Sequence, residues 1–249
     1  MNKLFLLLVS VLCASGFSKD YTRAEIKALS VAAEKGEAAA QYEYGVAHYH
    51  VAAGGGGYII RLGLNGGPAN PVEAAKWLLK AAEQGHAEAC LSIAQMYDEG
   101  IGLICSGIDA EKWMKQYAAK KTSEDGRVEH IMAVFYAKDR PDLPKNDKES
   151  VSWNLKAAIL SAGSGRDDAR WIEASRVALA TYYSDPKASD FNLSKAYAWW
   201  SVAAASGDAY ASKKRTESEK RLSPAEIKEG RSFAGQLMQQ IESKKKAAR

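Results

Sequence analysis

Apolar residues recur along this chain at the three- and four-residue spacing of helices, and the same helical pattern returns several times. The fullest copy is residues 195–207, KAYAWWSVAAASG. Weaker copies, each with a small residue three positions before a Trp, lie at 73–85, 109–118 and 149–158. The central tryptophans are 36, 40 and 46 residues apart, and they are Trp77, Trp113, Trp153 and Trp199. Spacings of this size are typical of repeat proteins built from helix pairs.

A second helical pattern precedes each Trp. In its clearest copy Ala89, Ile93 and Tyr97 are four residues apart and therefore share one helix face. Gly100 and Gly102 follow and are expected to end this helix. The same phase recurs in three other segments: Ala40, Tyr44, Gly45 and His48; Val128, Met132, Ala133 and Tyr136; and Ser175, Leu179, Ala180 and Tyr183. No segment competes with this pattern by showing the alternation of a strand.

Together the two patterns resemble the Sel1-like repeats (SLR), which are relatives of the tetratricopeptide repeats. The family pattern is small-x-x-x-Leu-Gly-x-x-Tyr, a Gly-x-Gly turn, Lys-Ala-x-x-Trp and Ala-Ala-x-x-Gly, and residues 195–207 match its second half almost fully. The resemblance covers residues 22–245. It departs at Ser106, where the family usually has Asp, and near Lys121, where the closing Gly is missing. It implies an all-α fold, an α/α solenoid of antiparallel helix pairs in a right-handed superhelix, capped by helices at both ends.

The repeats divide the chain into segments. We predict a secretory signal peptide at 1–16 and a single repeat solenoid at 17–245, with a basic tail at 244–249. Within the solenoid we predict a capping helix at 22–36, repeats at about 37–85, 86–121, 126–163 and 167–207, and a capping helix pair at 208–243. Capping-box spacing marks the start of both terminal helices, at Thr22 with Glu25 and at Ser223 with Glu226.

The first sixteen residues predict export. Lys3, the apolar run Leu4–Leu12 and the small residues Ala14–Gly16 have the order of a secretory signal, and the run is too short to span a membrane. Lipidation of Cys13 would make a lipoprotein, but Leu12 stands where lipoprotein signals usually have Gly, Ala or Ser. We therefore expect a periplasmic or secreted protein with no lipid anchor and no stable membrane insertion.

The first repeat contains an insert. From His48 to Trp77 the chain spans 29 residues, where the later repeats use 16 or 17. The extra residues lie in 51–68, where an apolar segment is flanked by glycines, and long loops of this kind are usually either functional or disordered. The insert either folds back onto its own repeat or contacts a partner. The candidate partner-binding residues are Tyr58, Ile59, Ile60, Arg61, Leu62 and Leu64.

The Trp, Tyr and Ala columns are expected to form the core between helices rather than a ligand site, because large aromatic side chains at such spacing are usually buried. The predicted repeat-core residues are Gly45, Trp77, Ala94, Tyr97, Trp113, Tyr136, Trp153, Tyr183 and Trp199. His48 occupies the column where the other repeats carry Tyr, so packing explains it better than metal binding does.

Charge and chemistry narrow the function. The net charge of +4 falls to about −1 without Lys3 and the basic tail, so no basic stripe for nucleic acid remains. The four histidines, which are His48, His50, His86 and His130, lack the spacing of a metal site. No Ser or Cys comes with a base and a third orienting group. We therefore predict no catalytic residues, no metal and no cofactor.

The two cysteines of the mature chain, Cys90 and Cys105, would lie near opposite ends of one helix. That separation is about 15 Å, whereas a disulfide needs Cα atoms within about 7 Å, so only a loop folding back would join them. Cysteine-rich members of the family join successive helix pairs by bridges, but Ala82 stands where the partner of Cys90 would be.

We predict an exported protein–protein interaction module that binds its partner through the insert at 51–68 and through a concave face lined by the first helices of the repeats. The resemblance implies adaptor and scaffold roles, and some exported bacterial members are similar to immunity proteins that neutralise type VI secretion effectors, including phospholipases. The alternatives are such a periplasmic immunity protein and a hydrolase of the cell envelope. The expected partner is another protein, either a secreted toxin or an envelope protein, and not nucleic acid.

Overall fold

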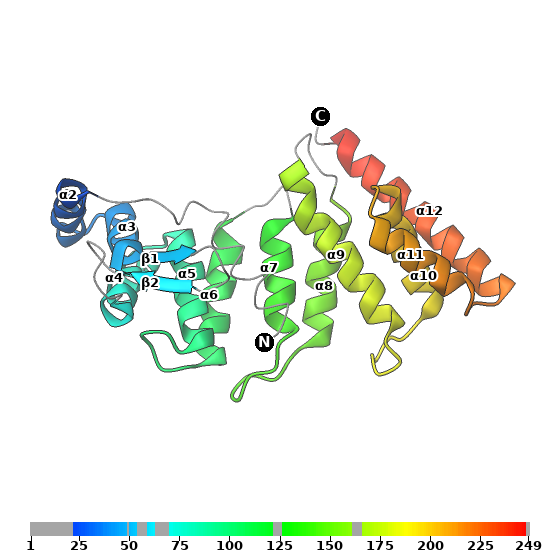
Figure 1. Cartoon of the computed structure of the whole chain (residues 1–249), viewed down its shortest axis with the longest axis horizontal. Coiled ribbons are helices and arrows are strands. Elements are labelled where there is room, and N and C mark those ends of the chain that lie inside the picture. The colour runs from blue at the N-terminus through cyan, green and yellow to red at the C-terminus, as the bar shows by residue number, and fades with distance from the viewer. Residues whose placement is uncertain are drawn as a thin grey trace. The chain divides into compact units, whose positions relative to one another are not determined.

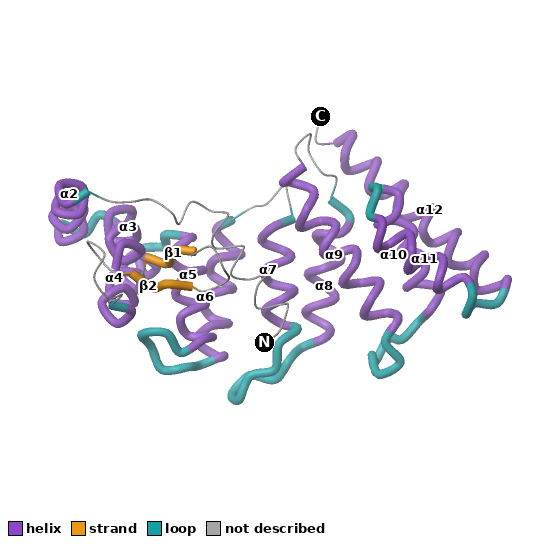
Figure 2. The backbone as a smooth tube through the Cα atoms, viewed as in Figure 1, coloured by secondary structure: helices purple, strands orange, loops and turns teal. Residues whose placement is uncertain are grey.

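The computed structural model describes residues 22–48, 50–53, 59–62, 70–121, 126–160 and 166–247. Within these ranges the chain forms eleven α-helices and one two-stranded sheet (Figures 1 and 2). The predicted signal peptide, including Cys13, lies outside them. None of the helices that the structure describes is long and apolar enough to cross a membrane.

The helices follow one another in pairs, as the α/α solenoid prediction requires. The first helices of the pairs are α3 (Ala38–His48), α5 (Ala87–Glu99), α7 (Arg127–Tyr136) and α9 (Arg166–Ser184). The second helices are α4 (Pro71–Glu83), α6 (Gly107–Lys120), α8 (Asp147–Ala158) and α10 (Leu193–Ala205). The terminal helices are α2 (Arg23–Glu34), α11 (Ala209–Glu219) and α12 (Pro224–Ala247). Each first helix packs against its own second helix, so the predicted fold class is confirmed.

Short polar side chains start the second helices. Their N-cap residues, whose side-chain oxygens accept a hydrogen bond from the backbone N–H three residues further on, are Asn70, Ser106, Asn146 and Asn192. Ser106 makes this bond to Asp109 at 3.1 Å, so its departure from the family pattern leaves the cap intact. The two predicted capping boxes are also formed, by Thr22 with Glu25 and by Ser223 with Glu226. A cap of this kind typically contributes about 1 kcal/mol.

The chain divides into two compact units. Unit 1 comprises the residues up to Lys121 together with 141–143, and unit 2 comprises 122–140 and the residues from Pro144 onward. In unit 1, α2 to α6 pack against one another in chain order. Gly45 allows a close approach of α3 to α4, because a Cβ there would lie 2.8 Å from Leu78 Cγ.

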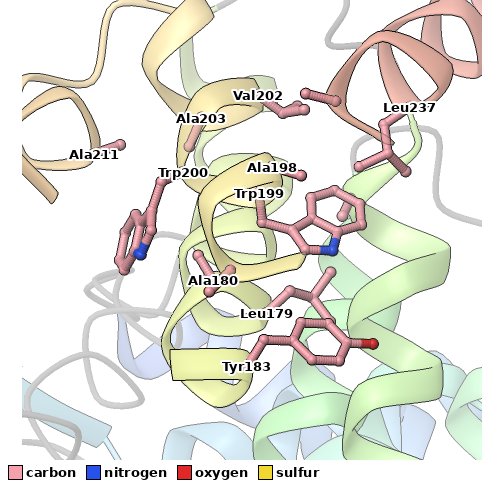
Figure 3. Packing of buried hydrophobic residues seen from close by; sticks show 13 residues of the cluster. Leu179, Ala180, Tyr183, Ala198, Trp199, Trp200, Val202, Ala203, Ala211 and Leu237 are labelled. Atoms are coloured by element: carbon pink, nitrogen blue, oxygen red, sulfur yellow. The ribbon is translucent and has the colours of Figure 1, made fainter. Parts of the chain in front are cut away.

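Trp199 lies at the centre of the core of unit 2 (Figure 3). Its side chain on α10 is fully buried, and the surrounding cluster includes Leu179 and Tyr183 of α9 and Leu237 of α12. Helix α10 therefore packs against both the first helix of its own repeat and the long terminal helix. Helix α12 continues to Ala247, so the lysines assigned to the basic tail are helical as far as the structure describes them.

The sheet lies in the insert of the first repeat and corrects the expectation that no strands form. It consists of β1 (His50–Ala53) and β2 (Ile59–Leu62), paired antiparallel with His50 opposite Leu62 and Ala53 opposite Ile59. β-branched residues favour strands, and the glycines between the two strands are typical of a hairpin connection. The helical periodicity of the repeats hid this local strand preference.

Candidate interaction surface

The insert is closed at its base by a backbone hydrogen bond. Helix α3 ends at His48, and the N–H of Asn70, the N-cap of α4, donates to the His48 carbonyl oxygen at 3.0 Å. In the later repeats the corresponding connections are only residues 100–106, 137–146 and 185–192. Equivalent bonds close these shorter connections, from Ser106 to Tyr97, Asn146 to Tyr136 and Asn192 to Tyr183, so the first repeat keeps the closure of the others despite its longer connection.

The candidate partner-binding residues fall in this insert. The backbones of Ile59, Ile60, Arg61 and Leu62 form β2, whereas Tyr58 and Leu64 lie outside the described residues. The structure therefore places four of the six on one strand of the hairpin. Their contact with a partner stays a prediction.

Tyr42 of α3 and His86 at the start of α5 form an aromatic pair on unit 1. Their rings are stacked with centroids 4.5 Å apart. His86 is also the N-cap of α5, where its Nδ1 accepts a hydrogen bond from the Ala89 backbone N–H at 3.2 Å. Burial lowers the pKa of His86 below its ordinary value and outweighs the opposite effect of nearby carboxylates, so the ring is held in the neutral form that the cap requires.

Charged and polar side chains extend this pair into a surface that joins two successive first helices. Lys121 Nζ lies 2.9 Å from Glu88 Oε1, and both Glu88 and Glu43 act electrostatically on His86. We call this surface the first-helix face of unit 1, and its half-buried residues are Tyr42, Glu43, His86, Glu88, Ser92 and Gln95. Aromatic residues such as Tyr42 are enriched at the centre of protein-binding surfaces, and polar residues such as those around it form the rim.

The predicted repeat-core residues lie mostly inside. Those that the structure buries are Gly45, Trp77, Ala94, Trp113, Tyr136, Tyr183 and Trp199. Tyr97 and Trp153 are only half-buried, and the Lys156 ammonium lies 3.7 Å from the centre of the Trp153 ring. His48, which stands in the column of Tyr97, packs edge-on against Tyr44 with ring centroids 4.8 Å apart.

His130 and Ser175 form a hydrogen-bonded pair within unit 2. His130 Nδ1 lies 3.0 Å from Ser175 Oγ, and its ring centroid lies 5.5 Å from that of Trp171. Desolvation lowers the pKa of His130 from 6.5 to about 4. A Ser–His pair can act as nucleophile and base only where substrate reaches the hydroxyl, and Ser175 is fully buried. The pair therefore joins α7 to α9 as part of the core.

The two cysteines that the structure describes are free thiols in different surroundings. Cys90 is buried and Cys105 is exposed. Burial raises the pKa of the Cys90 thiol, which makes it a poor nucleophile. Across the ranges that the structure covers, no three His, Cys, Asp or Glu side chains are grouped so that they could hold a metal ion.

The repeats of this chain match a known family model. The model of the Sel1 repeat matches residues 38–86, 87–120, 129–161 and 176–208, more than half of the chain. Each matched segment contains all or part of one first helix and one second helix. The chain belongs to the Sel1 repeat family. Sel1 repeats are generally protein–protein interaction modules and are typically non-catalytic.

Solved structures of Sel1 repeat proteins resemble this one. The crystal structure of a Sel1 repeat protein from Oxalobacter formigenes has a TM-score of 0.52 and 25% sequence identity, covering 76% of this chain and 67% of that one. The crystal structure of c5321, a protective antigen present in uropathogenic Escherichia coli strains displaying an SLR fold, has a TM-score of 0.42 and 19% identity. That comparison covers 90% of this chain and 50% of c5321. A comparison with curated protein sequences gives no match.

Two surface features of this Sel1 repeat protein were not predicted from its sequence. One is the stack of Tyr42 on His86, whose residues lie outside the repeat columns. The other is a set of exposed aliphatic side chains that includes Val72 and Ile108. The sequence does indicate the exposure of Val72 and Ile108, because both stand two residues after an N-cap, whereas the buried columns of these helices begin at Ala74 and Ala110.

Proposed function

We propose that this Sel1 repeat protein is an exported module that binds another protein through the insert at 51–68 and the first-helix face of unit 1. The observation that carries the proposal is that the first repeat has a much longer connection than the later repeats and still keeps their closing bond, which here joins Asn70 to His48. Insertions in repeat proteins map to loops on one face, which is often the binding face. A hairpin added to an otherwise intact helix pair fits this role.

The first-helix face supports the same proposal. First helices line the concave surfaces on which repeat proteins bind their partners. Stacked on the N-cap residue His86, Tyr42 offers an aromatic anchor that is already held in place, which lowers the entropic cost of binding. The ion pair of Glu88 with Lys121 adds charge of both signs for partner selection.

Export to the periplasm or beyond belongs to the proposal and is supported by Lys3, the apolar run Leu4–Leu12 and the small residues Ala14–Gly16. In that compartment the partner is either a secreted toxin, which the protein would neutralise as an immunity protein, or an envelope protein that it would scaffold. Identification of the captured partner separates these two roles.

The test is a quantitative pull-down from an envelope extract with the purified chain as bait. Deletion of residues 54–67 leaves the Asn70–His48 closure in place, so circular dichroism should show unchanged helicity while capture of the specific partner falls at least tenfold. Tyr42→Ala combined with Glu43→Lys should weaken the same capture. Tyr210→Ser, which removes an exposed aromatic side chain from α11 in unit 2, is the matched control. Unchanged capture by both the deletion and the double variant would refute the proposal.

A further inference from the structure

Three aliphatic side chains are strongly exposed where the connecting loops and the second helices of unit 1 meet. Val72, Ile104 and Ile108 are 66%, 89% and 58% exposed. Val72 and Ile108 each stand two residues after an N-cap, at equivalent positions of successive repeats, and Ile104 lies in the α5–α6 loop, the teal segment below those helices in Figure 2. Single exposed aliphatic residues are ordinary, whereas apolar side chains exposed close together can form a binding site.

Backbone packing holds the three residues along one edge. A Cβ on Gly102 would lie 2.2 Å from the Pro71 carbonyl oxygen, so the α5–α6 loop lies directly against the first residue of α4 and beside Val72. At the N-terminal end of α6, Asp142 accepts hydrogen bonds from the backbone N–H groups of Gly107 and Ile108, at 2.8 and 3.3 Å. The edge begins next to Asn70, at the base of the insert. We call Val72, Ile104 and Ile108 the loop-edge patch.

The surroundings of the loop-edge patch are acidic. The segments 70–75, 97–111 and 141–143 contain six acidic residues and no basic residue. The acidic residues are Glu73, Asp98, Glu99, Asp109, Glu111 and Asp142. Four basic residues lie close to these segments, and they are Lys76, Lys112, Lys115 and Arg140. Lys76 and Lys115 pair with Glu73 and Glu111 at 3.3 and 3.0 Å, Lys112 lies 5.4 Å from the centre of the Trp113 ring, and Arg140 donates hydrogen bonds to the carbonyl oxygens of Phe135 and Lys138. Six carboxylates against four basic groups leave an excess of two negative charges. A net negative field therefore surrounds an apolar centre.

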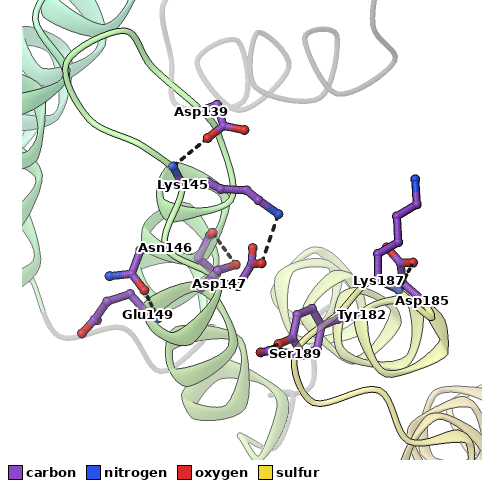
Figure 4. Close-up of polar contacts among 11 residues, drawn as sticks. Asp139, Lys145, Asn146, Asp147, Glu149, Tyr182, Asp185, Lys187 and Ser189 are labelled. Atoms are coloured by element: carbon purple, nitrogen blue, oxygen red, sulfur yellow. Dashed lines mark hydrogen bonds and ion pairs between the residues drawn. The ribbon is translucent and has the colours of Figure 1, made fainter.

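The corresponding loops of unit 2 have a different chemistry (Figure 4). There Asp139 Oδ1 accepts a hydrogen bond from the Lys145 backbone N–H at 2.9 Å, and Lys145 Nζ pairs with Asp147 at 3.0 Å. Lys148 and Ser194 occupy the positions equivalent to Val72 and Ile108. In the part of unit 2 that the structure describes, Phe191 is the one large apolar residue exposed in these loops. The patch is thus a local feature of unit 1 and not a property of the repeat.

We propose that the loop-edge patch docks a cationic amphipathic segment of the protein partner. Aliphatic side chains of that segment would cover Val72, Ile104 and Ile108, and its Lys or Arg side chains would face the surrounding carboxylates. This inference rests on the proposed function, because it assumes that the partner is a protein. The acidic rim opposes the other occupants: a second copy would oppose like charges in a symmetric contact, and anionic lipid and nucleic acid would be repelled.

The test measures the binding of two defined peptides to the purified full chain by fluorescence anisotropy. One is an 18-residue amphipathic helix of Leu and Lys, and the other has Glu in place of every Lys. We expect the Leu/Lys peptide to bind and the Leu/Glu peptide not to bind. The affinity for the Leu/Lys peptide should be at least tenfold lower at 500 mM salt than at 50 mM salt. The variant Val72→Ser/Ile104→Ser/Ile108→Ser should lose at least tenfold in affinity, and Glu99→Lys several-fold. The matched control Val31→Ser/Tyr210→Ser removes two apolar side chains exposed elsewhere and should bind as the wild type.

Three outcomes would overturn the inference: no binding of the Leu/Lys peptide, equal binding of both peptides, or unchanged affinity in the triple variant. Light scattering that shows a dimer dissolved by the triple variant would assign the patch to a second copy instead. These outcomes differ from failure of the proposed function. If deletion of residues 54–67 abolishes partner capture while the triple variant binds the peptide normally, the proposed function stands and the patch does not. If peptide binding depends on the patch while both the deletion and the Tyr42/Glu43 variant capture the partner normally, the patch stands and the proposed function does not.

Discussion

His86 caps α5 by accepting a hydrogen bond from the backbone N–H of Ala89, 3.2 Å from its Nδ1. Only the neutral imidazole can do so, because both ring nitrogens of the charged form are donors. A proton on His86 would remove the cap and place a positive charge at the positive end of the helix dipole. The lowered pKa of His86 agrees with this arrangement.

Replacing His86 by Asn should weaken the pH dependence of stability. The unfolded His86 takes up a proton near its ordinary pKa of 6.5, whereas the folded residue does so only at lower pH, so wild-type stability falls as the pH drops from 7 to 5. Asn caps α4, α8 and α10 in this chain, so His86→Asn keeps the cap and loses the titration. Urea unfolding at both pH values should show a smaller loss for the variant. The same loss in both proteins would contradict this prediction.

His130 should make a separate and larger contribution of the same sign. Its pKa falls from 6.5 to about 4 through desolvation, so the unfolded state binds more protons between these values and stability decreases as the pH falls through them. This shift corresponds to about 3 kcal/mol. His130→Gln can keep the hydrogen bond to Ser175 without titrating, so the variant should lose less stability than the wild type between pH 6.5 and 4.5 in urea unfolding. If the His130 imidazole titrates near pH 6.5 in the NMR spectrum of the folded protein, this account is excluded.

Gly45 and Gly235 should respond oppositely to replacement by Ala. At Gly45 the added methyl group would meet Leu78 at 2.8 Å and the Ala74 carbonyl oxygen at 3.2 Å, and overpacking of this kind costs about 1–3 kcal/mol. At Gly235 on α12 an added methyl group would meet no atom within 4 Å apart from the adjacent backbone, and the better helix propensity of Ala should add about 0.5–1 kcal/mol. Thermal unfolding of the two variants beside the wild type measures whether each substitution lowers or raises the stability. A neutral Gly45→Ala would mean that α3 and α4 do not approach so closely.

The tryptophans of the repeat column should not be equivalent. Trp199 is fully buried, so Trp199→Ala should cost about 3–5 kcal/mol. Trp153 is half-buried, so Trp153→Ala should cost less than about 2 kcal/mol. Denaturant unfolding of both variants tests the ranking, and equal losses would show that the two sites are packed alike.

The fold could be predicted because its determinants are local and repeated. The spacing of Trp77, Trp113, Trp153 and Trp199 reflects the length of a helix pair, and each pair buries its apolar stripe mainly against sequence neighbours. The helix starts were equally readable, since the capping boxes at Thr22 and Ser223 depend on residues three positions apart.

The surfaces could not be predicted in the same way. The strands of the insert pair across a loop, and the helical periodicity around them carries no information about that pairing. The contact of Tyr42 with His86 joins two repeats, and the loop-edge patch depends on Gly102 lying against Pro71. Such contacts join residues far apart in sequence, so the spacing of apolar residues within one helix does not specify them.

The backbone bond from Asn70 to His48 has counterparts in the later repeats, from Ser106 to Tyr97, Asn146 to Tyr136 and Asn192 to Tyr183, so a repeat can keep this closure whatever segment its connection carries. Because the residues that flank the insert meet in this bond, evolution or an engineer can exchange the insert for another segment without repacking a helix. New specificity can then arise by replacing one cassette, while the helices that carry it keep their sequence.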